Sequence, residues 1–402
     1  MKPPDDVLAP EAIADPGSFF RRLREEDPVY WSERHGVYIL TGYRDVHSAF
    51  RDRNLSSAGN IAGARQKLEA RYPSLLRHAL ELLDGWMLFN DPPAHTRLRE
   101  PVRRAFTPAV ASSLESTIES RVDNLLDGLN GEVDIVEDFA HPLTALVICD
   151  LLGVADSERI FLRGWTQDFG KLIYGASSRN PEYIEAVARA GDEFQERMTP
   201  FLARRRTDPR DDLTSKLLAS SQSEGWTEPE LLGAASMLLF AGHDTTSAAI
   251  ASATRALLCD PGARRLFTED PKQRVASAVE ELLRFDGPAK IFMRTATQQH
   301  DRGGHTIEAG QHLWLSVLGA NWDPSVFDQP EQLLIDREPN PHIAFGGGIH
   351  FCLGAALART EMRVALPRLF ERFPEMTIAT DELRWNATVV DRSLQALPVI
   401  IR

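Results

Sequence analysis

Cysteine is scarce in this chain of 402 residues, which contains only Cys149, Cys259 and Cys352. Three cysteines so far apart form no disulfide framework, and zinc or iron–sulfur sites need several cysteines close together. A disulfide-stapled fold and a metal cluster are therefore disfavoured. We expect the protein to work in a reducing compartment, the cytoplasm.

Long apolar runs, linkers and repeats are missing as well. No stretch reaches the roughly 18 uninterrupted apolar residues of a membrane span, and the first residues carry no apolar run for a signal or anchor. Since nothing marks a boundary, we expect one domain over residues 1–402. The 45 basic residues are outnumbered by 58 acidic ones, and the net charge of −13 argues against nucleic-acid binding.

One cysteine stands in an unusual setting. The loop Phe345-Gly-Gly-Gly-Ile-His-Phe-Cys352 has three consecutive glycines, which allow tight turns and a close approach of a large planar ligand. Helical spacing from Leu353 onward places Cys352 at a helix N-terminus, where a thiolate is favoured. Such a thiolate serves as a metal ligand or as a nucleophile. A free cysteine at a glycine-rich turn is the plainer alternative.

A long helix is expected between a capping box at Thr227-Glu-Pro-Glu230 and a stop at Asp260-Pro-Gly262. Its intervening residues, about 33 in number, would span about 50 Å. Midway, the apolar run is broken by Ala241-Gly-His-Asp-Thr-Thr246. These polar residues fit a helix kink with satisfied hydroxyls, or proton delivery by a carboxylate and a hydroxyl, with the glycine letting the helix widen and admit water.

Two further pairs have helical spacing. His95 and Arg99 stand four apart after Pro92 and Pro93, on one face of an expected helix. Glu281 and Arg284 stand three apart in another. On spacing alone, the first pair predicts a solvated basic face and the second a surface ion pair.

The cysteine loop resembles the haem-binding signature of the cytochrome P450 family, Phe-Gly-x-Gly-x-His-x-Cys-x-Gly. Every fixed position is filled, by Phe345, Gly346, Gly348, His350, Cys352 and Gly354. The resemblance implies haem b (iron protoporphyrin IX) with Cys352 as its thiolate metal ligand. It also implies a mainly α fold with a smaller β region, at roughly residues 28–41, 289–317 and 383–401, and a long central helix over the haem.

The same resemblance assigns roles to the other motifs. Ala241-Gly242-x-Asp244-Thr245 matches the family's Ala-Gly-x-(Asp/Glu)-Thr, which makes Asp244 and Thr245 the catalytic pair for proton delivery. Glu281 and Arg284 match the Glu-x-x-Arg pair, which Arg337 would join in a buried structural network. The remaining residues implied to bind the cofactor, four of them as propionate partners, are His95, Arg99, Arg294, His350, Ala241 and Gly242.

The region after Pro288 lines the substrate pocket in this family, and we expect substrate contacts at Phe240, Lys290, Ile291 and Val390. Lys290 is unusual there, because the family generally has apolar side chains at these positions. Pointing into solvent is its plainer reading, whereas an inward-pointing lysine would suit a substrate with a carboxylate or another acceptor.

The resemblance implies a haem-thiolate monooxygenase that inserts one oxygen atom from O2 into a small organic substrate, by hydroxylation or epoxidation. The length leaves no room for a fused reductase, so electrons would come from a separate ferredoxin or flavodoxin. Basic side chains near Cys352 would steer such an acidic partner, or simply form a solvated face: Arg103, Arg104, Arg359, Arg363, Arg368 and Arg372. The alternatives are a haem-binding sensor or carrier without turnover and a cysteine hydrolase on another fold.

Overall fold

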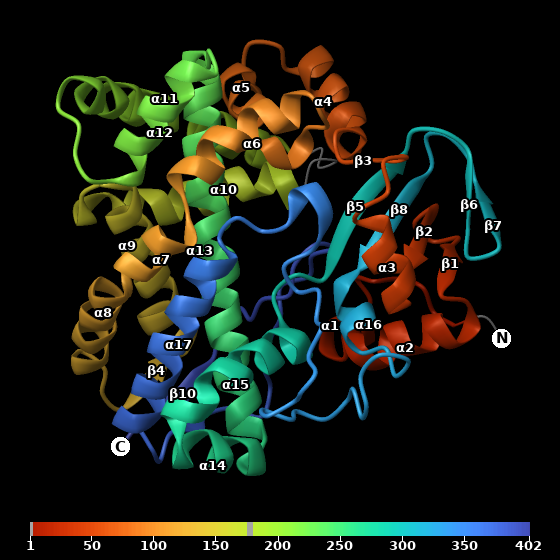
Figure 1. Ribbon diagram of the computed structural model, residues 1–402, viewed down its shortest axis with the longest axis vertical. Helices are drawn as coiled ribbons and strands as arrows, with labels where there is room; N and C mark the ends of the chain where they lie inside the picture. The colour runs from red at the N-terminus through yellow and green to blue at the C-terminus, as the bar shows by residue number, and fades with distance from the viewer. Residues whose placement is uncertain (1–2, 175–179) are drawn as a thin grey trace. The chain divides into compact units, whose positions relative to one another are not determined.

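The computed structural model describes residues 3–174 and 180–402, which form two units (Figure 1). The first unit comprises Met1–Leu55, Glu115–Thr144 and Thr245–Arg402, and the second comprises Ser56–Leu114 and Ala145–Asp244. The first holds the sheets and the cysteine loop, and the second is helical.

A five-stranded sheet organises one part of the first unit. Its order is β1 (Val29–Ser32), β2 (Val37–Leu40), β8 (His312–Ser316), β5 (Ile291–Ala296) and β3 (Leu55–Ser56). Strand β2 pairs in parallel with β8, whereas β5 pairs antiparallel with it. These strands are rich in β-branched and aromatic residues, and they bury Ile39, Leu313 and Leu315 completely.

Two smaller β elements complete the first unit. Strands β6 (His300–Arg302) and β7 (His305–Ile307) form a hairpin whose turn residues, Gly303 and Gly304, both have positive φ, which suits a two-residue turn. A three-stranded sheet joins β4 (Glu132–Asp134), β10 (Pro398–Ile400) and β9 (Thr377–Ile378). Strands β1, β2, β5, β6, β7, β8 and β10 lie within the expected β-rich stretches, whereas β3, β4 and β9 lie outside them and were not predicted.

Some helices of the first unit pack against the main sheet, and one follows the cysteine loop. Helix α2 begins at proline and is capped by Asp15, whose side chain accepts a hydrogen bond from the Ser18 amide. Helix α15 begins in the same way, with Asp270 as its cap. The helices are α1 (Pro10–Ala14), α2 (Pro16–Glu26), α3 (Tyr43–Ala49), α8 (Glu115–Asp127), α14 (Pro261–Glu269), α15 (Pro271–Asp286), α16 (Val317–Asn321) and α17 (Ala355–Arg372).

Aromatic side chains form the core of the second unit. Trp86 packs against Phe169 and Phe240, with ring centroids 5.5 and 5.2 Å away, and its indole N–H donates to the Ser236 hydroxyl at 2.8 Å. The helices of this unit are α4 (Gly59–Arg71), α5 (Arg77–Asp84), α6 (Ala94–Ala105), α7 (Pro108–Ser113), α10 (Arg159–Tyr174), α11 (Pro181–Thr207), α12 (Leu213–Ser223) and most of α9 (His141–Leu152).

The expected long helix is present as α13, Glu228–Cys259, with 32 residues. The predicted capping box forms at its start, where Glu230 Oε2 accepts from the Thr227 amide at 2.9 Å and the Glu230 amide donates to Thr227 Oγ1 at 3.4 Å. Within the described part of the chain, no helix is both long and apolar enough to cross a membrane.

Candidate haem-thiolate site

The glycines of the cysteine loop have the conformation that the sequence predicted. Gly346 and Gly348 have φ of +69° and +64°, and a Cβ on Gly348 would lie 2.1 Å from the Phe50 carbonyl oxygen. The Cys352 amide donates to the Phe345 carbonyl oxygen at 3.1 Å, which closes the loop. The turn is therefore specific to glycine for both conformational and steric reasons.

Cys352 is exposed and stands three residues before α17, which begins at Ala355 with Gly354 as its N-cap. A Cβ on Gly354 would lie 3.8 Å from the Cys352 Sγ, so a side chain at this position would contact the sulfur. A single accessible thiol beside a helix N-terminus fits the donor that a haem iron requires. In the same unit, Arg294 is 5 % exposed and offers a buried cation of the kind that pairs with a propionate.

Phe50 supports this loop, and sequence reasoning missed it. Its backbone contacts the Gly348 position, its ring packs edge-on against Phe292 at 5.6 Å, and the Arg294 guanidinium lies 5.8 Å from its ring centroid. No sequence signal distinguishes Phe50 from an ordinary core residue at a helix end, because its partners are about 240 to 300 positions away.

The predicted network around Glu281 is present, and its central ion pair, Glu281 with Arg284, is completely buried. Glu281 accepts from Arg284 Nε and Nη2 at 2.7 and 2.8 Å and from Arg337 Nε at 2.9 Å. The Leu334 amide and the Asn340 side-chain amide also donate to it, at 2.9 and 3.2 Å. Glu281 and Arg284 are 0 % exposed, so a solvated surface pair is excluded.

The middle of α13 presents polar atoms on an otherwise buried helix. Residues 231–240 are all buried, whereas Ala241 and Thr245, one turn apart, are exposed. Asp244 is half-buried, and its Oδ1 lies 2.9 Å from His243 Nδ1, a neighbour that sequence reasoning gave no role. The exposed Ala241–Thr245 face is therefore where this helix can meet a ligand.

The expected widening of α13 at Gly242 is absent, because the helix is regular through this residue. A Cβ at Gly242 would lie 2.7 Å from Ile148 Cδ1 of α9. Gly242 therefore allows close packing of α13 against α9, and the expectation that it admits water stays a prediction.

The other predicted cofactor and substrate residues lie in several settings. His95 is 2 % exposed on α6, and Arg99 Nη1 on the same helix lies 4.0 Å from Met87 Sδ. His350 ends a short 3-10 turn, Gly348–His350, just before Cys352. Phe240 lies in the aromatic core with Trp86. Ile291 is 2 % exposed within a cluster that includes Phe19 and Leu318, which does not support a substrate contact.

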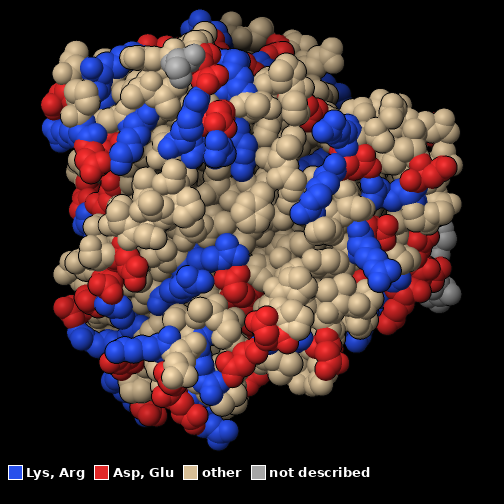
Figure 2. Space-filling view, in the orientation of Figure 1, with Lys and Arg blue, Asp and Glu red and all other residues tan. Residues whose placement is uncertain are grey.

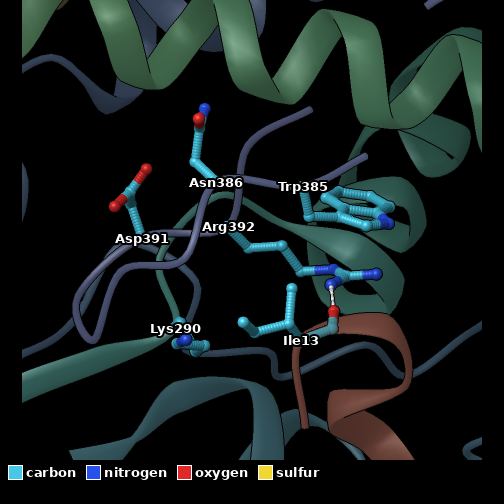
Figure 3. Close-up of a pocket in the computed structure, with 6 residues that line it drawn as sticks. All are labelled: Ile13, Lys290, Trp385, Asn386, Asp391 and Arg392. Carbon is cyan, nitrogen blue, oxygen red and sulfur yellow. Dashed lines mark hydrogen bonds between the residues drawn. The ribbon is translucent and has the colours of Figure 1, made fainter. Parts of the chain in front are cut away.

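Lys290 does not point into solvent, so the simpler of its two interpretations is wrong. It is 3 % exposed, and its ammonium donates to the Thr388 carbonyl oxygen. Burial lowers the pKa of Lys290 to about 8, against the opposing effect of the Asp391 charge. Figure 3 shows Lys290 and Asp391 in a small pocket with Ile13, Trp385, Asn386 and Arg392.

Val390 lies on the turn that Lys290 holds. Its carbonyl oxygen accepts from the backbone amides of Lys290 and Ile291, at 3.0 and 3.2 Å. The side chain of Val390 is half-buried. Hydrogen bonds to the carbonyl oxygens of Thr388 and Val390 thus join the turn at residues 388–390 to Lys290.

The arginines expected to form a basic patch are paired with acids. On α17, Arg368 contacts Glu119 and Asp123 at 2.9 and 3.2 Å, and Arg372 contacts Asp127. Arg103 donates to Glu100 at 2.7 Å. On the face in Figure 2, basic and acidic side chains are interspersed. Most of the positive charge on these helices is therefore locally neutralised.

Comparisons with known proteins agree with this geometry. The family model described as Cytochrome P450 matches residues 172–384. The chain is 37 % identical to cytochrome P450 107B1 of Saccharopolyspora erythraea, covering 98 % of each chain, and 34 % identical to the polyketide biosynthesis cytochrome P450 PksS of Bacillus subtilis, covering 96 % and 95 %. The crystal structure of myxobacterial cytochrome P450 CYP267B1 in complex with myristic acid superimposes with a TM-score of 0.89, at 34 % identity and 99 % coverage of each chain.

Together with these similarities, the mainly helical fold and the cysteine on a glycine loop identify the class as haem-thiolate proteins. The chain belongs to the cytochrome P450 family, and it is a monooxygenase with a haem cofactor.

Proposed function

We propose that the protein inserts one oxygen atom from O2 into a C–H bond or double bond of a small, largely apolar substrate, with Cys352 as the ligand of haem b. The observation that carries this proposal is the exposed Cys352 thiol on a loop that only glycine can form. When bound, the haem supplies the activation of O2. The residues of the protein would bind and orient the substrate and would transfer protons.

Proton delivery is the role proposed for Asp244 and Thr245. Asp244 is half-buried on α13, and its carboxylate is the acidic group next to Thr245 in the sequence. Thr245 is exposed on the same helix as Ala241, where a hydroxyl can pass a proton to a ligand. His95, Arg99, Arg294 and His350 are proposed as donors to the propionates.

Replacing Cys352 with Ser tests the iron ligand. Wild-type protein reduced under carbon monoxide should show the red-shifted absorption band that a thiolate ligand produces, and the C352S variant should lose it. A C352S spectrum identical to the wild-type spectrum would overturn the proposed ligand. The comparison needs no knowledge of the substrate.

Turnover distinguishes the enzyme from the alternative, a haem-binding sensor or carrier. With a surrogate ferredoxin and reductase, D244N and T245A should lower the rate of product formation by about 100-fold or more, in line with loss of a proton-transfer group. A sensor would consume no O2 beyond background in any variant. The proposed electron donor is a separate ferredoxin or flavodoxin.

The proposal also covers the substrate class, the cellular location and the domain organisation. PksS is named for polyketide biosynthesis and CYP267B1 was solved with myristic acid, so we propose a fatty acyl or polyketide-like substrate. Titrating the ferric protein with myristic acid and with a macrolide should shift the Soret band to shorter wavelength for one of them. We also propose a cytoplasmic location, because the chain has only three cysteines and they are far apart in sequence, and a single domain over residues 1–402.

A further inference from the structure

Glu280, the neighbour of Glu281, joins α15 to both sides of the cysteine loop. Its carboxylate accepts from Arg359 Nε and Nη2, both at 2.7 Å, and from His342 Nε2 at 3.0 Å. Burial alone would raise the pKa of Glu280, but the hydrogen bonds from His342 and Arg359 outweigh it and lower this pKa to about 2. Glu280 therefore carries a full negative charge at neutral pH.

The hydrogen bonds of His342 define its tautomer. The Ala344 amide donates to His342 Nδ1 at 3.2 Å, so Nδ1 holds a lone pair and the proton is on Nε2, where it is donated to Glu280. The charges that face one another directly are Glu280 and Arg359, with Arg363 farther away at 3.8 Å and more exposed.

The contacts of Arg359 lead from this ion pair to Cys352. The Arg359 guanidinium lies 4.3 Å from the centroid of the Phe345 ring, within the range of a cation–π contact. Phe345 in turn accepts the hydrogen bond from the Cys352 amide. The pair thus contacts the residue that closes the loop around the sulfur, from the helix that follows the loop.

Glu280 and Glu281 have different partners although they are adjacent. Glu281 is completely buried and binds two arginines and the amides of Leu334 and Asn340. Glu280 keeps 24 % of its side chain exposed, and its partners all flank the Cys352 loop. Glu281 already links segments of the fold through its buried network. The adjacent Glu280 can therefore have a separate role.

We propose that Glu280 is a positioning residue that holds the cysteine loop through Arg359 and Phe345 and sets how readily the iron bound by Cys352 is reduced. This inference rests on the proposed ligation by Cys352. Reduction adds one negative charge at the iron. An unbalanced Arg359 cation over Phe345 favours the reduced form, and an unbalanced Glu280 carboxylate disfavours it.

Shifts of the ferrous/ferric equilibrium in opposite directions in two variants distinguish this electrostatic role from a purely structural one. E280Q removes the anion and leaves Arg359 charged, so it should shift the ferrous/ferric equilibrium about tenfold toward ferrous, which is about 59 mV for a one-electron couple. R359M keeps the aliphatic stem, leaves Glu280 charged, and should shift the equilibrium in the opposite direction. The double variant should return to within about threefold of wild type, because both charges are then absent.

The experiment is a spectroelectrochemical titration of the full-length haem protein. The matched control is R368M, since Arg368 lies on the same helix and its ion pairs with Glu119 and Asp123 are of the same kind. It should stay within about threefold of wild type. E280D keeps the charge and should do the same, which also provides a readable variant if E280Q folds poorly.

Shifts of E280Q and R359M in the same direction, or no shift in either, would overturn the role of Glu280. The absorption of the reduced carbon monoxide complex is recorded for every sample. A wild-type protein without the thiolate band would overturn Cys352 ligation itself. A wild-type protein with the band but with parallel shifts in the two variants would overturn only the present inference.

Discussion

Loss of the Glu281 carboxylate should destabilise the protein severely. In E281Q the two buried guanidinium groups of Arg284 and Arg337 lose the anion to which both donate, at a site with 0 % exposure of Glu281 and Arg284. Breaking a buried ion pair by removing one partner raises the free energy of folding by about 3 to 5 kcal/mol, because an unpaired charge remains buried. The glutamine amide group also turns one acceptor into a donor facing another donor.

Urea titration followed by far-UV circular dichroism measures this loss. The matched control is E269Q, because Glu269 and Arg265 form an exposed pair at 3.7 Å, which should contribute less than about 0.5 kcal/mol. E281D keeps the anion and should recover part of the loss. An E281Q protein within about 1 kcal/mol of wild type would show that the network contributes little, and would refute the reasoning from burial and unpaired charge.

Three further perturbations test local features. T227A removes the α13 capping hydroxyl and should lower the free energy of unfolding by about 1 kcal/mol in a urea titration, whereas T227S should not. Because the pKa of Lys290 is about 8 when folded and 10.5 is its ordinary value, the unfolded chain binds more protons between these values. Stability should therefore rise with pH across that window, and urea midpoints of K290M should not show this rise. G348A should lower the melting temperature more than G304A; both glycines have positive φ, but only the Cβ of the first would overlap the Phe50 carbonyl oxygen, and equal losses would contradict that overlap.

The chemistry of the site was readable from local sequence. Gly346 and Gly348 predicted a turn that needs positive φ, and the apolar run with a capping box at Thr227 predicted a helix of nearly the observed length. Such signals depend on residues a few positions apart, where backbone geometry follows from residue type alone. The resemblance to the cytochrome P450 family added Arg337 to the Glu281 pair, a contact across 56 positions.

Only the tertiary structure decided which side chains are buried and which charged groups form ion pairs. The simpler interpretation placed Lys290 in solvent, yet it is buried and donates to the Thr388 carbonyl oxygen, and Ile291 packs into a hydrophobic core cluster. The arginines of α17 look like a free basic face in sequence but have acidic partners from α8 and α15. The sequence alone therefore determined which residues can form tight turns, which can cap helices and which could coordinate a metal. Which charges are neutralised and which side chains leave water depended on segments distant in the chain, because the energies of burial and pairing arise only when those segments meet.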